Sequence, residues 1–511
     1  MAEQAGKRVA TGRTLAVAAL AFCATACSLA PSTREMGQNA LAAMGGAERV
    51  RAIRNFAMTG GTGSRAALGQ AVKVTLADHA ATLAEVVETV DLANGRAALA
   101  YEVTTPSGFS QRRREILTKV GDRPVGLEEV GQRPLTAVSA SGLFSWGTQN
   151  SPAMTLRRNV VVVALSAAEA ATTELTESRT LDERSLQYGR TILDHESVGV
   201  YFDSKTGLIA AYETLDSEEM LGDVTAVYLL DDYRPVAGVL LPHRIRILKG
   251  DAPYADVQFT GATVNNDAAM NLFEIPPAAT VGVEQVMAAG ADYSPVTLTS
   301  LGHDVYFAQA YSHHSLVVVF PSYIALVEAP YTEAQTRTLV RRLETQFPGK
   351  PVKYAAVTHP HFDHTGGLRA VAAAGATILV TDGHARAIRA LLEARHTNPA
   401  DALGINRSTG GKVGGLSVFN AKYVLGEGEQ LLELYALTGS PHADPIVVAF
   451  VPSAGILFQS DLYVPATGAP STPEAVHLLQ ALRKLGITPT VHAGGHGGVA
   501  PFDELVKAIG E

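Results

Sequence analysis

The sequence predicts a two-domain protein in which a mostly antiparallel β-domain of the α+β class precedes an α/β domain. At 511 residues, the chain is too long for one ordinary hydrophobic core. From residue 56 to about 285, apolar and polar residues alternate with period two, and Gly, Asp, Asn and Pro separate the runs. From about 286 onward, apolar runs of strand length alternate with helical patterns, which is typical of helices that cover the faces of a sheet.

The first 26 residues have the pattern of a signal peptide. Lys7, Arg8 and Arg13 precede a short apolar run, and small residues follow it. The sequence Ala24-Thr25-Ala26-Cys27 resembles a bacterial lipobox, although Ala24 stands where Leu is common. The resemblance implies export to the periplasm and a membrane anchor on a lipidated Cys27. Ordinary cleavage after Ala26 or Ala30 is the alternative.

Charge and cysteine content narrow the classes of partner and metal ligand. The net charge is −9 and no basic stripe is present, which argues against nucleic acid as a partner. The two cysteines of the chain, Cys23 and Cys27, lie in or next to the signal peptide. The mature chain therefore has no internal disulfide and no thiolate for a metal site, so any metal ligands must be His and Asp.

The predicted domains span residues 27–285 and 286–511. In the first domain, a capping box at Ser32–Glu35 opens a helix that ends at Gly45-Gly46. Strands are predicted at Val72–Leu76, Ala98–Val103, Gly199–Phe202, Leu208–Thr214, Thr225–Leu230, Leu240–Leu248 and Ala255–Ala262. Residues 161–180 are predicted as a helix. In the second domain, helices are predicted at Glu333–Gln346 and His384–Arg395, with a long loop over residues 397–415.

The segment from Thr358 to Gly367, THPHFDHTGG, carries the strongest chemical signal. It places His359, His361, Asp363 and His364 within six residues, directly after a buried strand. Buried imidazole and carboxylate groups need partners, and both groups bind divalent metals. His359 and His361 point the same way in an extended segment. Asp363 and His364 follow in a turn, where they can face a second metal.

Three further metal-competent residues follow predicted strands or lie in glycine-rich sequence. His442 follows the strand at Leu431–Leu437, Asp461 follows Ile456–Gln459, and His496 lies within Gly-Gly-His-Gly-Gly. Together with the first segment they complete a two-metal site.

The motif HxHxDH followed by His442, Asp461 and His496 resembles the metallo-β-lactamase-fold hydrolase superfamily over residues 300–505. This resemblance implies an αββα sandwich with two zinc ions at one edge, iron and manganese remaining open as alternatives. It implies that the first zinc is bound by His359, His361 and His442, that the second is bound by Asp363, His364 and His496, and that Asp461 bridges them. His492 is the rival to His496; the family pattern of His-Gly followed by Pro favours His496.

The N-terminal half resembles the β half-barrel of lipoprotein-sorting carrier proteins. The segments that carry this likeness are AMGGAERVRAI at residues 43–53, DYRPVAGVLLPH at 232–243 and NLFEIP at 271–276. The likeness implies a concave apolar surface that holds an acyl chain or docks a partner. A β-domain that only supports the C-terminal half is the alternative.

The resemblance to the hydrolases implies a mechanism in which a metal-bridging hydroxide attacks a small-molecule substrate. Asp363 is the candidate for orienting or relaying the proton, and Tyr463 for stabilising the oxyanion. His313 and His314 are candidate substrate contacts. Asp461 resembles the bridging residue of lactonases, thioesterases and phosphodiesterases, which favours cleavage of ester, lactone or amide bonds; β-lactams stay open. Iron-dependent dioxygenase chemistry and an envelope protein that binds lipid or lipoprotein are the alternatives.

Overall fold

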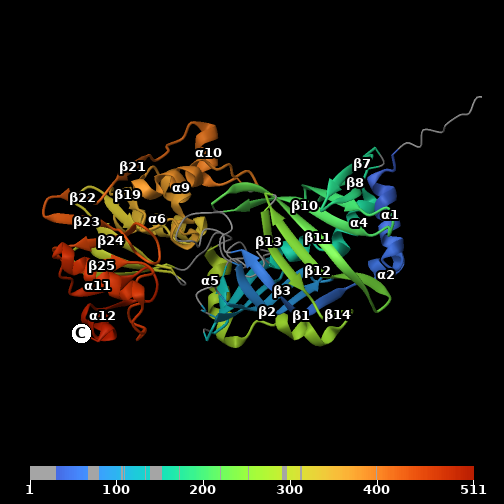
Figure 1. Ribbon diagram of the computed structural model, residues 1–511, viewed down its shortest axis with the longest axis horizontal. Helices are drawn as coiled ribbons and strands as arrows, with labels where there is room; N and C mark the ends of the chain where they lie inside the picture. The colour runs from blue at the N-terminus through green and yellow to red at the C-terminus, as the bar shows by residue number, and fades with distance from the viewer. Residues whose placement is uncertain are drawn as a thin grey trace, which may run out of the picture.

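The computed structural model describes residues 30–510 apart from 67–79, 105–107, 109, 133, 139–151, 172, 219, 251, 290–295, 311–312 and 399. The predicted signal peptide and the predicted strand Val72–Leu76 lie outside the described residues. Two bodies lie side by side along the long axis, an N-terminal one (blue to yellow-green) and a C-terminal one (yellow to red; Figure 1). Among the described residues, no helix has the length and apolarity to cross a membrane.

The N-terminal domain is built on one antiparallel sheet of 14 strands, ordered β6-β5-β4-β3-β2-β1-β13-β12-β11-β10-β9-β8-β7, with β14 paired to β1. In chain order the strands are β1 (Asn55–Ala66), β2 (Ala80–Asp91), β3 (Arg96–Thr104), β4 (Ser110–Val120), β5 (Arg123–Val130), β6 (Thr136–Val138), β7 (Glu177–Leu181), β8 (Arg184–Leu193), β9 (Glu196–Phe202), β10 (Ile209–Glu218), β11 (Gly222–Val236), β12 (Val239–Lys249), β13 (Ala252–Gln258) and β14 (Gly261–Val264). The predicted antiparallel β-domain is confirmed.

Helices cover both faces of this sheet. On one face, α1 (Thr33–Ala43) and α4 (Val160–Glu169) pack together over a large apolar core, near α2 (Ala47–Arg51) and α3 (Pro152–Arg157). The predicted capping box forms in part, because the Ser32 hydroxyl accepts a hydrogen bond from the Glu35 N–H. On the other face, α5 (Thr280–Ala289) and the 3₁₀ turns η2 (Asp267–Phe273) and η3 (Pro277–Ala279) cover a smaller core beside β3–β6.

The C-terminal domain contains two sheets. The first has the order β15-β16-β17-β18-β19-β20-β21 and the second β22-β23-β24-β25-β26-β27. Their strands are β15 (Thr297–Gly302), β16 (Val305–Gln309), β17 (Ser315–Val319), β18 (Ile324–Val327), β19 (Val352–Ala356), β20 (Thr377–Thr381), β21 (Leu416–Phe419), β22 (Lys422–Glu427), β23 (Gln430–Leu437), β24 (Ile446–Val451), β25 (Ile456–Gln459), β26 (Val491–Gly494) and β27 (Val499–Pro501).

Three separate apolar cores define the layers of this domain. One lies between the outer face of the first sheet and the helices α6 (Glu333–Gln346), α8 (Leu368–Ala373), α9 (Asp382–Glu393) and α10 (Ala402–Thr409). A second is formed between the two sheets. A third joins the second sheet to α11 (Pro473–Leu485) and α12 (Asp503–Ile509). The order helix, sheet, sheet, helix is the predicted αββα sandwich.

Several predicted elements differ from the observed ones. The predicted boundary at 285/286 falls inside α5, whose Val283 and Val286 pack on the N-terminal sheet; the chain changes domain between Ala289 and Thr297. The predicted loop 397–415 contains α10, which Asp401 caps by accepting the Gly404 N–H. The predicted helix at 161–180 ends at Glu169, and β7 occupies its last part. Alanine-rich sequence favours a helix locally, but pairing with β8 decides the end of this segment.

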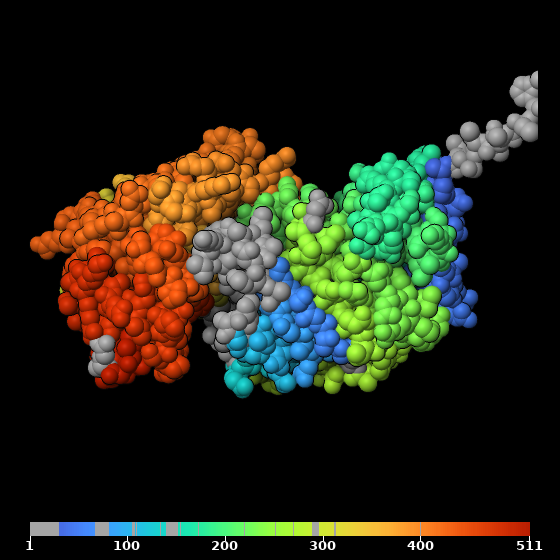
Figure 2. Space-filling model, in the orientation of Figure 1, coloured from blue at the N-terminus to red at the C-terminus, as the bar shows by residue number. Residues whose placement is uncertain are grey.

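The two domains are joined by contacts between the β10–β11 turn and the segment after α9. Asp223 donates its N–H to Arg395 O (2.6 Å), and its carboxylate accepts the N–H and the hydroxyl of Thr397, both at 2.8 Å. Asn398 donates to Glu196 at 3.2 Å. A Cβ on Gly222, whose φ is +73°, would lie 2.1 Å from Arg395 O, so this close approach requires glycine. The two domains therefore meet at this point, and Figure 2 shows orange residues of the C-terminal domain against green residues of the N-terminal domain.

Candidate metal centre

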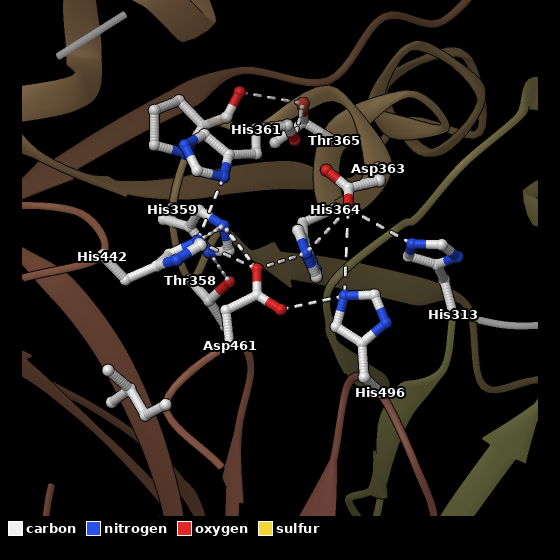
Figure 3. A network of polar contacts seen from close by, with 12 residues as sticks. His313, Thr358, His359, His361, Asp363, His364, Thr365, His442, Asp461 and His496 are labelled. Atoms are coloured by element: carbon white, nitrogen blue, oxygen red, sulfur yellow. Dashed lines mark hydrogen bonds and ion pairs between the residues drawn. The ribbon is translucent and has the colours of Figure 1, made fainter. Parts of the chain in front are cut away.

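The histidine-rich segment leaves the end of β19 and turns into the short helix α7 (Phe362–Thr365). Its backbone is tied to the second sheet, because the Val447 N–H donates to Thr358 O at 2.8 Å. Thr365 closes the turn by donating its hydroxyl to His361 O at 2.8 Å. The segment therefore lies at the edge where the two sheets meet, and its side chains face the ends of β23 and β25 (Figure 3).

A first group of potential ligands comprises His359, His361, His442 and Asp461, whose donor atoms all lie within 4.8 Å of one another. His442 Nε2 is 3.1 Å from His361 Nδ1 and 3.3 Å from His359 Nε2. Asp461 Oδ2 is 3.1 Å from His359 Nε2. Three imidazole nitrogens and a carboxylate oxygen converge on one point, which is the donor set of a zinc-type site.

A second group comprises Asp363, His364, Asp461 and His496, again within 4.8 Å. Asp461 Oδ2 lies 2.9 Å from His364 Nε2, while its Oδ1 lies 2.9 Å from His496 Nε2. Asp363 Oδ2 is 3.4 Å from His364 Nε2 and 3.8 Å from His496 Nε2. Asp461 thus belongs to both groups, and its two oxygens face different histidines (Figure 3).

The buried groups of the site shift one another's pKa values. Burial lowers the pKa of His364 and His496, but nearby carboxylates, Glu328 first for His364 and Asp461 first for His496, outweigh it and raise both. Burial lowers the pKa of His359, and the neighbouring His364 and His361 lower it further. Burial raises the pKa of Asp461, but the surrounding histidines, His364 first, outweigh it and hold that pKa well below its ordinary value. His364 Nε2 is fully buried without a hydrogen bond, although Asp461 Oδ2 is near. The residues fit a pair of divalent cations, because cations bound among these carboxylates would replace the protons on His364 and His496 and leave neutral imidazoles and ionised carboxylates, the forms that bind metal.

A family model for the metallo-beta-lactamase superfamily matches residues 333–497. Residues 333–497 form a metallo-beta-lactamase superfamily domain. With its intact His and Asp site, this domain is that of a metal-dependent hydrolase. No curated protein matches the chain.

Solved structures of metallo-beta-lactamases are similar to part of the chain. A metallo-beta-lactamase from Pontibacter korlensis is 18% identical, covering 42% of this chain and 96% of that chain, with a TM-score of 0.32. A metallo beta lactamase from Hirschia baltica is 19% identical, covering 42% of this chain and 95% of that chain, with a TM-score of 0.31. The family match lies in the C-terminal domain, so it gives no support to the resemblance of the N-terminal half to lipoprotein-sorting carriers.

Glu328 contacts two residues of the histidine-rich segment and was not among the residues predicted from the sequence. It is fully buried, and its Oε2 lies 3.0 Å from His364 Nδ1. Its Oε1 accepts the Thr358 hydroxyl at 2.5 Å. A carboxylate on the far nitrogen of a metal-binding histidine fixes the ring and its tautomer. The sequence feature that could have identified Glu328 is its position as an acidic residue directly after a fully apolar strand, Ile324–Val327.

The two predicted substrate contacts lie in different environments. His313 Nε2 is 3.2 Å from Asp363 Oδ2, and burial lowers the pKa of His313 to about 3. A neutral His313 can therefore donate to Asp363. His314 instead accepts the Ala310 N–H at Nδ1, and its Nε2 donates to Gly497 O at 3.0 Å. His313 contacts the site directly, whereas His314 connects its loop to the loop that carries His496.

His492 belongs to neither of the two ligand groups. The Tyr463 hydroxyl donates to Glu504 of α12 at 3.1 Å, and its oxyanion role stays a prediction. His492, the rival to His496, is fully buried, and its ring stacks on Tyr463 with centroids 5.7 Å apart. Burial lowers the pKa of His492 to about 3. His492 packs as a neutral core residue, while His496 faces Asp461.

Proposed function

We propose that this protein is an exported dinuclear zinc hydrolase that cleaves an ester, lactone or amide bond in a small molecule. The observation that carries the proposal is the position of Asp461, whose two carboxylate oxygens lie 3.0 Å from His442 Nε2 in one group and 2.9 Å from His496 Nε2 in the other. A carboxylate shared in this way suits two metal ions at the spacing used in hydrolysis, about 3.5–4 Å.

When bound, two zinc ions supply Lewis acidity and lower the pKa of a water molecule. The side chains of the protein would hold the metal ions and would accept and release the proton. Asp363, which accepts from neutral His313, is the group placed to take up a proton at its carboxylate and pass it on. Because burial keeps His313 uncharged, it orients this carboxylate without competing for the proton.

The substrate approaches from the side of His442 and His496. These side chains are 27% and 25% exposed, while those of His359 and His364 are fully buried. The buried side, with His359 and His364, excludes water from the ligands. The partly exposed side, with His442 and His496, leaves room for the bond that is cleaved. The shared Asp461 resembles the bridging residue of lactonases, thioesterases and phosphodiesterases. Since the net charge is −9, polyanionic nucleic acids are disfavoured as substrates.

A substrate panel tests the proposal. The zinc-loaded full-length protein is assayed with an ester, a lactone, a thioester, an amide, a phosphodiester and a β-lactam, in parallel with Asp363→Ala. Asp382→Ala, which changes an exposed aspartate of the same domain, is the control. Cleavage of an ester, lactone or amide by the wild type and control, reduced at least a hundredfold in Asp363→Ala, supports the proposal. Equal rates in all three proteins contradict it.

We also propose that the protein is an exported lipoprotein anchored through Cys27. The support is the charged and apolar pattern of residues 1–26 followed by Ala24-Thr25-Ala26-Cys27. Metabolic labelling with a fatty acid in a bacterial host tests it. Label in the wild type but not in Cys27→Ser supports lipidation, and an unlabelled wild type that is secreted and cleaved contradicts it.

A further inference from the structure

The segment that carries His496 consists otherwise of glycine. Residues 494–498, from the end of β26 to the start of β27, are Gly-Gly-His-Gly-Gly. A Cβ on Gly495 would lie 1.7 Å from Ser460 Oγ, so the close packing at that position requires glycine. Glycine has more backbone freedom than any other residue, and these glycines have no side chains that could fix the segment. The position of the His496 ring therefore depends on hydrogen bonds from other segments.

Two N–H groups of this segment bind within its own half of the domain. The Gly495 N–H donates to Gln459 O, at the end of β25, at 2.9 Å. The Gly498 N–H donates to Pro465 O, also at 2.9 Å. These two bonds use donors of the segment. The carbonyl groups on either side of His496 therefore need donors from elsewhere.

His314, on the other sheet of the domain, supplies both of these donors. It directly precedes β17 and is buried, with 3% of its surface exposed. Its backbone N–H donates to Gly495 O at 2.9 Å. Its ring Nε2 donates to Gly497 O at 3.0 Å. One residue of the first sheet thus holds the backbone on both sides of His496.

The partners of the His314 ring fix which of its nitrogens carries a proton. The Ala310 N–H donates to Nδ1 at 3.3 Å, so Nδ1 acts as an acceptor. A backbone carbonyl can only accept, so the proton is on Nε2, which contacts Gly497 O. The edge of the ring also packs against Phe307 of β16, with centroids 5.0 Å apart. The ring is therefore held in the plane and the tautomer that place a donor at Gly497.

The neighbouring residue, His313, contacts the side chain of His496 itself. The two rings lie edge to face with centroids 4.4 Å apart. His313 Nε2 is also 3.2 Å from Asp363 Oδ2. Two adjacent histidines before β17 therefore contact the second ligand group, His313 through side chains and His314 through the backbone.

We propose that His314 is a positioning residue for the second metal ion, and that it acts through the two carbonyl groups that flank His496. This role rests on the proposed function only in that His496 is taken to bind that ion. It replaces the substrate contact expected for His314 from the sequence, because the ring donates to the backbone of a ligand. The competing view is that His314 only fills space beside Phe307.

Three substitutions separate the donor of His314 from the packing of its ring. His314→Gln keeps an N–H group at about the position of Nε2, where it reaches Gly497 O. His314→Met has nearly the same length and fills the space beside Phe307, but it has no donor. His314→Asn keeps an acceptor for the Ala310 N–H and is too short to reach Gly497 O. His303→Asn, at an exposed histidine of the same domain, is the control.

The test measures zinc affinity rather than hydrolysis. The full-length proteins are titrated with zinc against a chromogenic chelator, and thermal unfolding of each reports folding separately. We expect His314→Met and His314→Asn to weaken the second zinc about tenfold, in the range found for outer-shell partners. His314→Gln should retain most of the wild-type affinity. The first zinc, and both zinc ions in the control, should be unchanged.

Wild-type affinity for the second zinc in His314→Met, or equal weakening in His314→Gln and His314→Met, overturns the positioning role. If His314→Met or His314→Asn fails to fold, the other still gives the comparison with His314→Gln. If no substrate is cleaved, the zinc titration still stands, so failure of the hydrolase proposal and failure of this one are told apart.

Discussion

His364 Nδ1 lies 3.0 Å from Glu328 Oε2, with both side chains fully buried. The carboxylate orients a histidine whose other nitrogen faces Asp461. We expect Glu328→Gln to weaken the second metal about ten- to a hundredfold, because an amide is a weaker acceptor for the ring N–H. Isothermal titration with zinc measures this. Glu344→Gln, at an exposed position on α6, is the control, and equal affinity in both variants would contradict the role of Glu328.

Asp461 and Asp363 should differ in their effect on metal stoichiometry. Asp461 belongs to both ligand groups, whereas Asp363 belongs to one. We therefore expect Asp363→Ala to retain one zinc per chain and Asp461→Ala to lose affinity at both sites. Elemental analysis after dialysis at a fixed free zinc concentration distinguishes them. Retention of two ions by Asp461→Ala would exclude a shared carboxylate.

Glu88 makes the stability of the N-terminal domain depend on pH. This buried carboxyl lines a mostly apolar cavity with Phe56, Met58 and Tyr212, and burial raises its pKa from 4.5 to about 7. The folded state therefore holds the proton more tightly than the unfolded state. The contribution of Glu88 to the free energy of unfolding is therefore fully present below pH 4.5 and is lost as the pH rises through about 7.

The neutral substitution Glu88→Gln should remove this dependence. One pKa unit corresponds to about 1.4 kcal/mol, so the variant should be more stable than wild type by about 3 kcal/mol at pH 8. At pH 4 the two should differ little. Denaturant unfolding at both pH values measures the difference, and a constant difference across the range would contradict the assignment.

Gly222 should control docking of the two domains. Gly222→Ala introduces both a strained φ and a contact of 2.1 Å with Arg395 O. Gly121→Ala is the matched control, because its φ is +60° and a Cβ there meets nothing within 4 Å. Both variants should lose about 1 kcal/mol through strain. Only Gly222→Ala should open the segment after α9 to limited proteolysis, and equal protection in both would contradict this role of the contact.

The metal-binding residues were predictable because their chemistry is poorly suited to any other buried role. His359, His361, Asp363 and His364 follow an apolar strand within six residues, and the predicted partners His442 and Asp461 follow other strands. Parallel pairing of β18, β19 and β20 places the ends of these strands at one edge of the first sheet, and the hydrogen bond from Val447 N–H to Thr358 O joins that edge to the second sheet. Local sequence therefore indicated the site, and the alternation of strands and helices indicated the sandwich.

The supporting residues were not predictable, since their roles depend on contacts between distant segments. Glu328 looks ordinary in sequence, because its partners Thr358 and His364 lie on another segment of the chain. The hydrogen bond from Tyr463 to Glu504 of α12 was likewise not predictable, because these residues are far apart in the sequence.

The most direct test of a two-metal hydrolase is the rate of substrate cleavage as a function of zinc bound per chain. Metal-free protein is titrated with zinc and assayed on the best substrate of the panel. We predict no activity without metal, a rise that levels off at two zinc ions per chain, and loss of that activity in Asp461→Ala. Cleavage by the metal-free protein, or full activity in Asp461→Ala, would contradict the account.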